Sequence, residues 1–546
     1  MGIAWRGVAF VRRMVLVAAV VSFTTAASAQ STPDAGAIQG QNDLQREDLE
    51  DNAPRPGDDD SVTAPAREAP PEIPSGGPTF TLTRVDFDKS EFLSDAELAA
   101  IAAPFVGRAI DFSGIQALIN AVNARYSELG IVTASASLPE QELTGGVLRI
   151  ELIEGRVGTV RLEGATRSSD YVSRRIRLEP GTVVDVPKLG RRVATFNRTS
   201  EARVQTVLQP GTEFGMTDLT LSVTEPQRNS LEIFTDNFGT PNVGRYQLGG
   251  LFQHYGLLGL DDRLKLYGVY SEGNLAGNAS YTFGFAPTGG RIGLSYSRSA
   301  IRIVDGPFEP LDVKGGSQGG GINFVQPLYG DATWLLLANA GGTVTNSVTT
   351  QSGLELTNNL TWKGTAGVTL GYYGSRVAFS VSPYYAYAHT DMRVVGDSEQ
   401  VHFFAGSASL TAILPGELVL KGNGSWQVAS QLLVTGDQLF QIGGPTTIRG
   451  YDSGAVSGGT GYYGSLELHR DLSPVMEGLD VFGFVDHGAV FSTAPRQVSL
   501  TALGAGLTYT YRNRVTFELT AGIPVGDKLP GQPELAVFGR IIVKAF

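Results

Sequence analysis

One arginine and one aspartate in the last quarter of this 546-residue chain have the types and neighbours expected of a buried ion pair. Arg449-Gly450-Tyr451 lies in a glycine-rich stretch, 443–459, and Asp486 lies in the later segment Phe484-Val485-Asp486-His487-Gly488. A guanidinium and a carboxylate can pair through two parallel hydrogen bonds, which fixes one relative geometry. The glycines allow tight turns of the backbone against a neighbouring wall. These residues are able to pair and so to hold a loop against a strand, and they predict no catalytic group.

The elements that must position this pair are β-strands. From Asn229 to Phe546 only strand patterns occur, and we count sixteen. Several alternate cleanly, because Val515, Phe517, Leu519, Ala521 and Ile523 share one face while Thr516, Glu518 and Thr520 share the other. An even number of alternating strands is typical of an outer-membrane β-barrel. The fold class predicted is mainly β, with a sixteen-stranded transmembrane barrel over 229–546.

The connections between these strands alternate in length. The predicted short turns are 258–261, 287–290, 328–330, 374–375, 415–416 and 512–513, and the predicted long loops are 303–313, 346–356, 390–399, 430–459 and 526–532. Short turns on one side and long loops on the other are expected of a barrel in the outer membrane. A soluble sandwich would not predict this alternation.

A sixteen-stranded barrel is wide enough to hold an aqueous channel, so it must be closed when idle. The loop 430–459 is long enough to enter the lumen and carry Arg449 with it. Asp486 faces the lumen if Val481, Gly483 and Val485 face lipid. Glu467, on another strand, is a further candidate on the lumen side. The alternative is that Arg449 is a solvated loop cation and Asp486 a hydrated carboxylate.

The first 78 residues predict targeting and linking segments. Arg6, Arg12 and Arg13 precede a short apolar run, and Ala27-Ser28-Ala29 gives a small-residue cleavage site, so 1–29 is a predicted secretory signal peptide. Residues 30–78 have a solvated, Pro-rich composition, within which 38–50 predicts a short polar helix.

Two small modules are predicted between this linker and the barrel. In 79–155 the order is strand, helix, helix, strand, strand, with a capping box from Ser94 to Glu97 and a second helix over 112–129. Residues 156–226 repeat the same order with a period of about 75 residues.

Composition excludes several classes of function. The chain has no Cys, which removes disulfides and thiol nucleophiles, and its net charge of −12 argues against a nucleic-acid binder. None of its five histidines lies in a zinc or serine-hydrolase motif, so neither an enzyme nor a metal or cofactor site is predicted. A passive porin would not need two periplasmic modules.

Three motifs, in this order, resemble the transporter component of two-partner secretion, a family related to the barrel-assembly insertases. Leu138-Pro139-Glu140-Gln141-Glu142-Leu143, Gly146 and then Ile153-Glu154-Gly155-Arg156-Val157 resemble the periplasmic POTRA repeat. Ile448-Arg449-Gly450-Tyr451 resembles the tip of the sixth extracellular loop, which folds back into the pore. Phe484-x-Asp486-x-Gly488 resembles the thirteenth-strand motif that meets this loop.

The resemblance implies a function and a set of site residues. It implies two POTRA domains (79–155 and 156–226), a sixth extracellular loop over 430–459, a removable plug helix over 38–50, and no cofactor. The implied partners are a secreted exoprotein, outer-membrane lipid and the barrel-assembly machinery that inserts the chain into the outer membrane of a Gram-negative cell. A barrel-assembly insertase stays the alternative. The residues implied for the lock between loop and barrel are Arg449, Gly450, Tyr451, Phe484, Asp486, Gly488 and Glu467.

Client recognition is expected on the first module. The strand-like segment 131–138 can add an extended client strand by backbone pairing, although it can equally do no more than complete the sheet of its module. The candidate client-binding residues are Ile131, Thr133, Ser135, Ser137, Leu118 and Val122.

Overall fold

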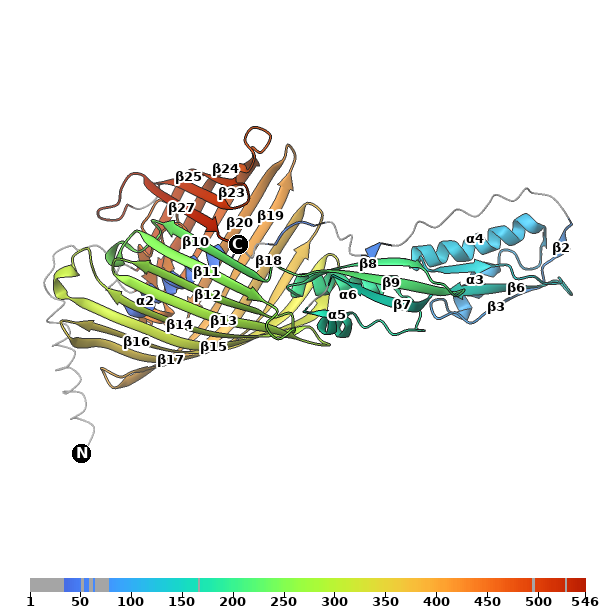
Figure 1. Ribbon diagram of the computed structural model, residues 1–546, viewed down its shortest axis with the longest axis horizontal. Coiled ribbons are helices and arrows are strands. Elements are labelled where there is room, and N and C mark those ends of the chain that lie inside the picture. Colours follow the sequence, from blue (N-terminus) through green and yellow to red (C-terminus); the bar gives the residue numbers. More distant parts are fainter. Residues whose placement is uncertain are drawn as a thin grey trace, which may run out of the picture.

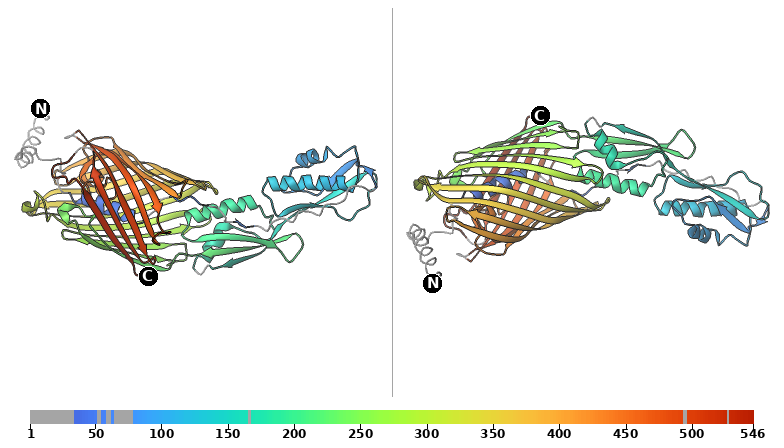
Figure 2. Two further views of the ribbon diagram at one scale, coloured as in Figure 1. Left: turned by 90° about the horizontal axis from the view of Figure 1, so that it is seen from above. Right: turned by 90° about the horizontal axis from the view of Figure 1, so that it is seen from below.

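The computed structural model describes residues 34–50, 54–57, 62–63, 78–164, 167–492, 496–525 and 528–546. Two small modules lie in a row and lead to a wide β-barrel, and the N-terminal helix α2 (Ala35–Leu49) lies inside that barrel (Figures 1 and 2). The predicted signal peptide, 1–29, and much of the predicted linker lie outside the described residues.

The first module packs two helices on a small sheet. Helix α3 (Asp95–Ala102) begins with the predicted capping box, in which Ser94 and Glu97 exchange hydrogen bonds. The bond from the Ser94 backbone lowers the pKa of Glu97 to about 2. Helix α4 (Phe112–Glu128) buries one face against the sheet. The strands are β2 (Phe80–Thr81), β3 (Arg84–Phe87), β4 (Ala109–Ile110), β5 (Ala134–Ser137) and β6 (Val147–Glu154).

The second module repeats this order of elements, as the sequence predicts. Its helices are α5 (Ser169–Ile176) and α6 (Val186–Thr199), and its strands are β7 (Arg156–Glu163), β8 (Arg203–Pro210) and β9 (Met216–Thr224). A two-residue strand from the linker, β1 (Val62–Thr63), joins the same sheet, whose order is β1-β8-β9-β7. The linker therefore contributes to a domain far from it in sequence, which composition alone did not predict.

A buried aspartate fixes the second module to the periplasmic end of the barrel. Asp261 lies in the turn between two barrel strands, is fully buried, and accepts backbone N–H groups of Glu201 and Ala202 at 2.7 and 2.9 Å. It also accepts Arg291 Nη1 at 2.8 Å and the Tyr255 hydroxyl at 3.0 Å. A buried carboxylate with four donors holds one arrangement, so the module is attached to the barrel rigidly.

Sixteen antiparallel strands close into a barrel, which confirms the predicted fold class. The last strand pairs with the first over 540–544 and 232–236. The first eight are β10 (Asn229–Asp236), β11 (Gln247–Tyr255), β12 (Arg263–Ser271), β13 (Asn274–Phe285), β14 (Gly290–Arg302), β15 (Val313–Gly330), β16 (Trp334–Gln351) and β17 (Leu354–Tyr373). The last eight are β18 (Val377–Met392), β19 (Asp397–Leu414), β20 (Leu418–Ala429), β23 (Thr460–Asp471), β24 (Leu479–Phe491), β25 (Gln497–Tyr511), β26 (Val515–Pro524) and β27 (Ala536–Lys544).

The predicted alternation of faces is present along these strands. On β26 the side chains of Phe517, Leu519 and Ile523 are exposed outward, where a lipid bilayer would cover them. The inward face of the wall is polar and small, with Ser295, Ser317 and Thr343 among its residues. In the part of the chain that the structure describes, no helix is both long enough and apolar enough to cross a membrane.

Two predicted long loops are wrong. Strands β16 and β17 run on to a turn of two residues, Ser352 and Gly353, inside the predicted loop 346–356. Strands β18 and β19 likewise leave only 393–396 of the predicted loop 390–399. Polar residues outnumber apolar ones in both segments, so the sequence there lacks the regular alternation that marks a lipid-facing strand.

These long strands make one side of the barrel taller than the other. Strands β15, β16, β17 and β19 have 18, 18, 20 and 18 residues, whereas β10, β11, β12 and β27 have 8, 9, 9 and 9. The turns at the periplasmic end lie against the second module, as Arg198 stacking on the Tyr373 ring at 3.8 Å illustrates. The additional length of about 30 Å along the strands therefore lies at the opposite, extracellular end.

Candidate functional site: a locked loop and a helix inside the barrel

The segment between β20 and β23, residues 430–459, folds into the barrel lumen. It contains the short 3₁₀ turn η3 (Gly436–Gln438) and two strands that pair with each other, β21 (Phe440–Ile442) and β22 (Val456–Gly458). Its apolar side chains pack on the inner wall in a cluster of buried residues: Ile442, Ile448, Tyr451, Val456, Val490, Leu500 and Ala502. The loop is thus a folded part of the barrel interior, held by its own small core.

The predicted pair of Arg449 and Asp486 is present. Asp486 is fully buried on β24, and Arg449 is 6% exposed. The guanidinium donates from Nε to Asp486 Oδ2 at 2.9 Å and from Nη2 to Oδ1 at 2.8 Å, and the Arg449 backbone N–H also donates to Oδ2 at 2.9 Å. A bidentate pair reinforced by a backbone donor fixes both the side chain and the loop backbone.

Further groups surround the guanidinium. Glu467 accepts from Nη1, Ser465 accepts from Nη2 at 2.8 Å, and the ring centroid of Phe484 lies 3.7 Å from Cζ. Glu467 is held in turn by His469, whose other ring nitrogen contacts Asp480 at 2.6 Å. The sequence predicted Glu467 and Phe484 at this site, but not Ser465, His469 or Asp480. Because side chains alternate along β23, Ser465, Glu467 and His469 share one face. The inward position of Glu467 could therefore have predicted Ser465 and His469 as well.

The remaining predicted lock residues have structural roles. Gly450 has φ of +144°, a conformation that side chains rarely adopt, and a Cβ there would lie 2.9 Å from Ala502 Cβ. Tyr451 is fully buried, and its hydroxyl donates to the Thr501 carbonyl at 3.4 Å. Gly488 lies so close to β23 that a Cβ would approach the Tyr462 carbonyl oxygen to 2.6 Å.

Gly522 on β26, which no sequence pattern predicted at this site, lets the loop approach the wall. A Cβ at this position would lie 2.1 Å from the Arg449 carbonyl oxygen. We expect Gly522→Ala to push the Arg449–Gly450 backbone off the wall and to weaken the lock by about 1–3 kcal/mol. The measurement is maleimide labelling of a cysteine at buried Ile448, in a chain without native cysteine. Labelling should accelerate in Gly522→Ala and not in Gly539→Ala, where the nearest atoms would lie at 3.8 Å. Equal labelling rates in the two variants would contradict this role.

Helix α2 occupies the lumen beside the loop. Its first turn lies near the extracellular end, where the Ala35 N–H donates to Thr349 Oγ1 at 3.2 Å. In its middle, Gln41 Nε2 donates to Gln441 of the loop at 3.0 Å. At its end Asp48 pairs with Arg540 at 2.9 Å and Glu50 pairs with Lys265 at 2.8 Å. The predicted helix over 38–50 is thus present and begins three residues earlier, after its N-cap Asp34.

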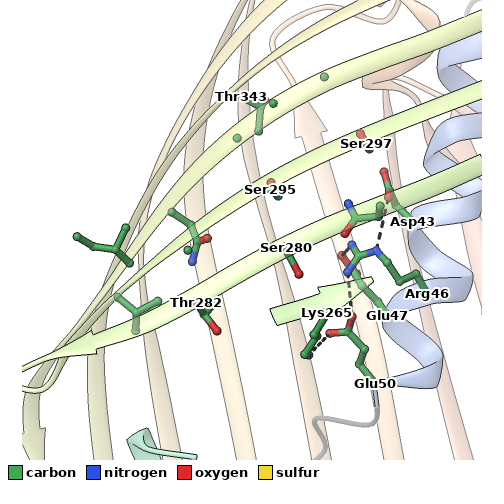
Figure 3. A pocket seen from close by; sticks show the side chains of 18 of the residues that line it. Asp43, Arg46, Glu47, Glu50, Lys265, Ser280, Thr282, Ser295, Ser297 and Thr343 are labelled. Carbon is green, nitrogen blue, oxygen red and sulfur yellow. Dashed lines mark hydrogen bonds and ion pairs between the residues drawn. The ribbon is translucent and has the colours of Figure 1, made fainter. Parts of the chain in front are cut away.

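A polar cavity of about 790 Å³ separates α2 from the wall of strands β13 to β16 (Figure 3). The helix turns Asp43, Glu47 and Glu50 toward it, and the wall offers mainly hydroxyl, amide and glycine groups. Such a wall can exchange hydrogen bonds with a passing backbone without holding any one sequence strongly. No cluster of three or more potential metal-ligating side chains occurs among the described residues.

Some of the predicted client-binding residues are buried in the structure, and others are partly exposed. Leu118 and Val122 are fully buried and Ile131 is 4% exposed, so the prediction is wrong for these three as surface contacts. They form the core between α4 and the sheet, because the same apolar spacing that suggested a contact face packs the helix on its own module. Thr133 donates to the Val184 carbonyl of the second module at 3.2 Å.

Ser135 and Ser137 lie on β5, which pairs within the described residues on one side only, with β6. The other edge of β5 is partly covered by α4, because Asn123 Oδ1 accepts the Ala136 N–H at 2.8 Å. Ser135 and Ser137 are partly exposed and stay candidate contacts.

Comparison with known proteins agrees with this geometry. Residues 80–155 match the POTRA domain of the ShlB type, and residues 215–509 match the haemolysin secretion/activation protein ShlB/FhaC/HecB. The second match covers more than half of the chain. The chain belongs to the haemolysin secretion/activation family. As in that family, the barrel lies in the outer membrane and the POTRA region lies in the periplasm.

Relatives of this family member include named outer-membrane transporters. The chain is 30% identical over 281 residues to the outer membrane transporter CdiB of Escherichia coli O6:K15:H31, a match that covers 49% of this chain and 46% of that protein. It is 23% identical over 498 residues to CdiB of Dickeya dadantii, covering 86% and 87% of the two chains. The solved structure of CdiB from Escherichia coli superposes with a TM-score of 0.71 at 22% identity, over 94% of this chain and 100% of that one, which establishes the shared fold.

Proposed function

We propose that this chain exports a secreted partner protein across the outer membrane. The observation that carries the proposal is a wide polar lumen closed by two separable elements, the locked loop 430–459 and helix α2. A lumen that is wide but closed at rest suits intermittent passage of a polymer better than steady diffusion of small solutes. The relatives named above are transporters, which supports the same conclusion.

In this proposal the periplasmic modules receive the unfolded partner and the barrel conducts it. The second module, 156–226, has the order of elements of the first, and we propose that it is a second POTRA domain. Its rigid attachment through Asp261 would deliver the client beside the lumen. The partner would move because it folds outside the cell, with no nucleotide, cofactor or catalytic step in this chain. Insertion of the barrel itself would use the barrel-assembly machinery and the surrounding outer-membrane lipid.

Deletion of residues 79–155 tests the proposal. We expect loss of the exported protein from the culture medium, while the purified barrel keeps the conductance of the intact chain in planar bilayers. The exported protein is found by comparing medium proteins of cells with and without the intact chain. Normal export after the deletion would contradict the proposed role of the first module.

The same cells test the alternative of a barrel-assembly insertase. Loss of the chain should then lower the amounts of other outer-membrane barrels and leave the medium proteins unchanged. We expect the reverse, with normal amounts of other barrels and at least one missing medium protein.

A further inference from the structure

The outer wall of the barrel carries an arginine that has no protein partner on the lipid-facing side. Arg298 on β14 faces outward, because Ser295 and Ser297 of the same strand line the lumen and side chains alternate. Arg298 is exposed, and no side chain in the described part of the chain pairs with it. A cation on the lipid-facing wall is costly in the hydrocarbon and tolerated near the headgroups. Arg298 should therefore meet its partner in the headgroup layer.

Strand β16 shows where the apolar band of the wall ends. Its outward positions begin with Trp334 at the periplasmic end and become polar at Asn346. The outward residues between these two are apolar or glycine: Leu336, Ala338, Ala340, Gly342 and Val344. The stretch is about 40 Å long along the strand, or about 28 Å high at a tilt of about 45°. This is close to the apolar band of about 25 Å in such barrels, so Asn346 marks its extracellular edge.

Arg298 and Asn346 belong to one polar row across three neighbouring strands. Arg298 pairs directly with Gln318 of β15, and Gln318 pairs with Asn346 of β16. Arg393, in the turn after β18, donates from Nη1 to Asn346 Oδ1 at 3.3 Å. Adjacent strands lie about 4.8 Å apart, so the backbone of Arg298 lies about 10 Å from that of Asn346. The row therefore offers two guanidinium groups and two amides to a single large headgroup.

A notch in the same wall lies just below this row, on the membrane side. It has a volume of about 460 Å³ and lies over β15 to β18. Gly342 and Gly364 are paired neighbours and form its floor, between the side chains of Ile322 and Tyr387. A Cβ at Gly364 would meet no atom within 4 Å. The missing side chains leave an apolar slot that the acyl chain of a lipid can fill.

The row stays positively charged in spite of one acidic member. Asp391 on β18 lies two strands beyond Asn346 in the same register. Its carboxylate contacts Nε2 of His389, which borders the notch, at 3.2 Å. Two arginines thus stand against one aspartate, and a headgroup with several anionic groups complements the row better than a zwitterionic one.

We propose that the outer wall of β14 to β18 binds a phosphorylated and acylated glycolipid of the extracellular leaflet, which is the chemistry of lipopolysaccharide. Its phosphates would pair with Arg298 and Arg393, its sugar hydroxyls would exchange hydrogen bonds with Gln318, and one acyl chain would fill the notch. The bound lipid would support the tall strands where they leave the membrane. This inference does not depend on export of a partner protein.

The test is native mass spectrometry of the purified full chain in detergent, titrated with lipid A, the phosphorylated and acylated part of lipopolysaccharide. We expect the wild type to bind lipid A and Arg298→Gln to bind it about five-fold more weakly, the effect of one cation near an anionic headgroup. Gly364→Leu should also weaken binding, because it fills the notch without a clash and without a change of charge. Dephosphorylated lipid A should bind the wild type no better than it binds Arg298→Gln.

The matched controls lie in the periplasmic half of the wall, where another outer notch is bordered by Arg470 and Gly483. Arg470→Gln and Gly483→Leu make the same two changes there and should bind lipid A as the wild type does. Heat-modifiable migration checks that every variant is folded. Equal affinities of Arg298→Gln and Arg470→Gln for lipid A would overturn the inference. An equal affinity for phosphatidylglycerol, equally lowered by Arg298→Gln, would assign the site to phospholipids and would also overturn it.

Discussion

Replacing Arg449 by Ala should nearly abolish export while leaving the amount of folded barrel unchanged. The replacement leaves Asp486 buried without its partner and removes all four side-chain hydrogen bonds to Asp486, Ser465 and Glu467. Breaking a buried pair from one side costs about 3 kcal/mol, which shifts the docking equilibrium of the loop by about 150-fold. The barrel wall should persist, because its strands pair without the loop. Export and heat-modifiable migration of the barrel measure the two effects.

The matched control is Arg245→Ala, which removes another ion pair of the same loop. Arg245 pairs with Asp452 at 2.8 Å, but both side chains are more than a third exposed. The replacement should therefore weaken the docking of the loop by less than about 1 kcal/mol. A double-mutant cycle with Asp486→Ala then tests direct coupling. If the effects of Arg449→Ala and Asp486→Ala on export, expressed as free energies, were fully additive in the double mutant, the two residues would act independently, contrary to the geometry.

Removal of helix α2, residues 34–50, should leave the lumen open at rest. The helix is the only described segment besides the loop 430–459 that lies inside the barrel, and its contacts reach from Thr349 to Lys265. We expect purified protein to show sustained conductance in planar bilayers and cells to become sensitive to antibiotics too large for ordinary porins. The single variant Asp48→Ala removes one contact to Arg540 and should shift the ratio of closed to open channels by about five-fold, equivalent to about 1 kcal/mol.

Glu47→Gln is the control for these helix variants. Its side chain is 65% exposed and contacts Arg46 of the same helix, so its neutralisation should leave conductance unchanged. If the chain without α2 is as silent as the intact protein, the loop alone closes the lumen and the helix is no plug.

The amino-acid sequence predicted most of the fold and the centre of the site. Alternation along β26 and the apolar spacing in α4 follow directly from the burial of one face, so Val515–Pro524 and Phe112–Glu128 agree with expectation within one or two residues. Arg449 and Asp486 could be paired because the loop 443–459 contains one cation, the strand motif contains one carboxylate, and both motifs resemble those of the two-partner secretion transporters. Glu467 followed from its inward position on β23.

The missed residues depend on contacts between elements that carry no local pattern. Gly522 looks like any strand glycine until the Arg449 carbonyl lies against it. Asp261 lies in an ordinary polar turn, and only the docked second module makes it a buried acceptor. Strand β1 has two residues, too few for any periodicity. The prediction that Leu118 and Val122 contact the client was wrong although a local pattern was present. Apolar spacing along a helix predicts that one face is buried, but it does not say which element covers that face.

The unequal height of the barrel has a consequence for the direction in which a polypeptide leaves it. Strands β15 to β19 stand as a screen on one side of the exit, while the short strands β10 to β12 and β27 leave the opposite side low. An emerging chain is shielded from its surroundings on the screened side and meets solvent first over the low rim. The exit is therefore asymmetric. Successive segments of an exported chain would emerge on the same side of the barrel, over the short strands.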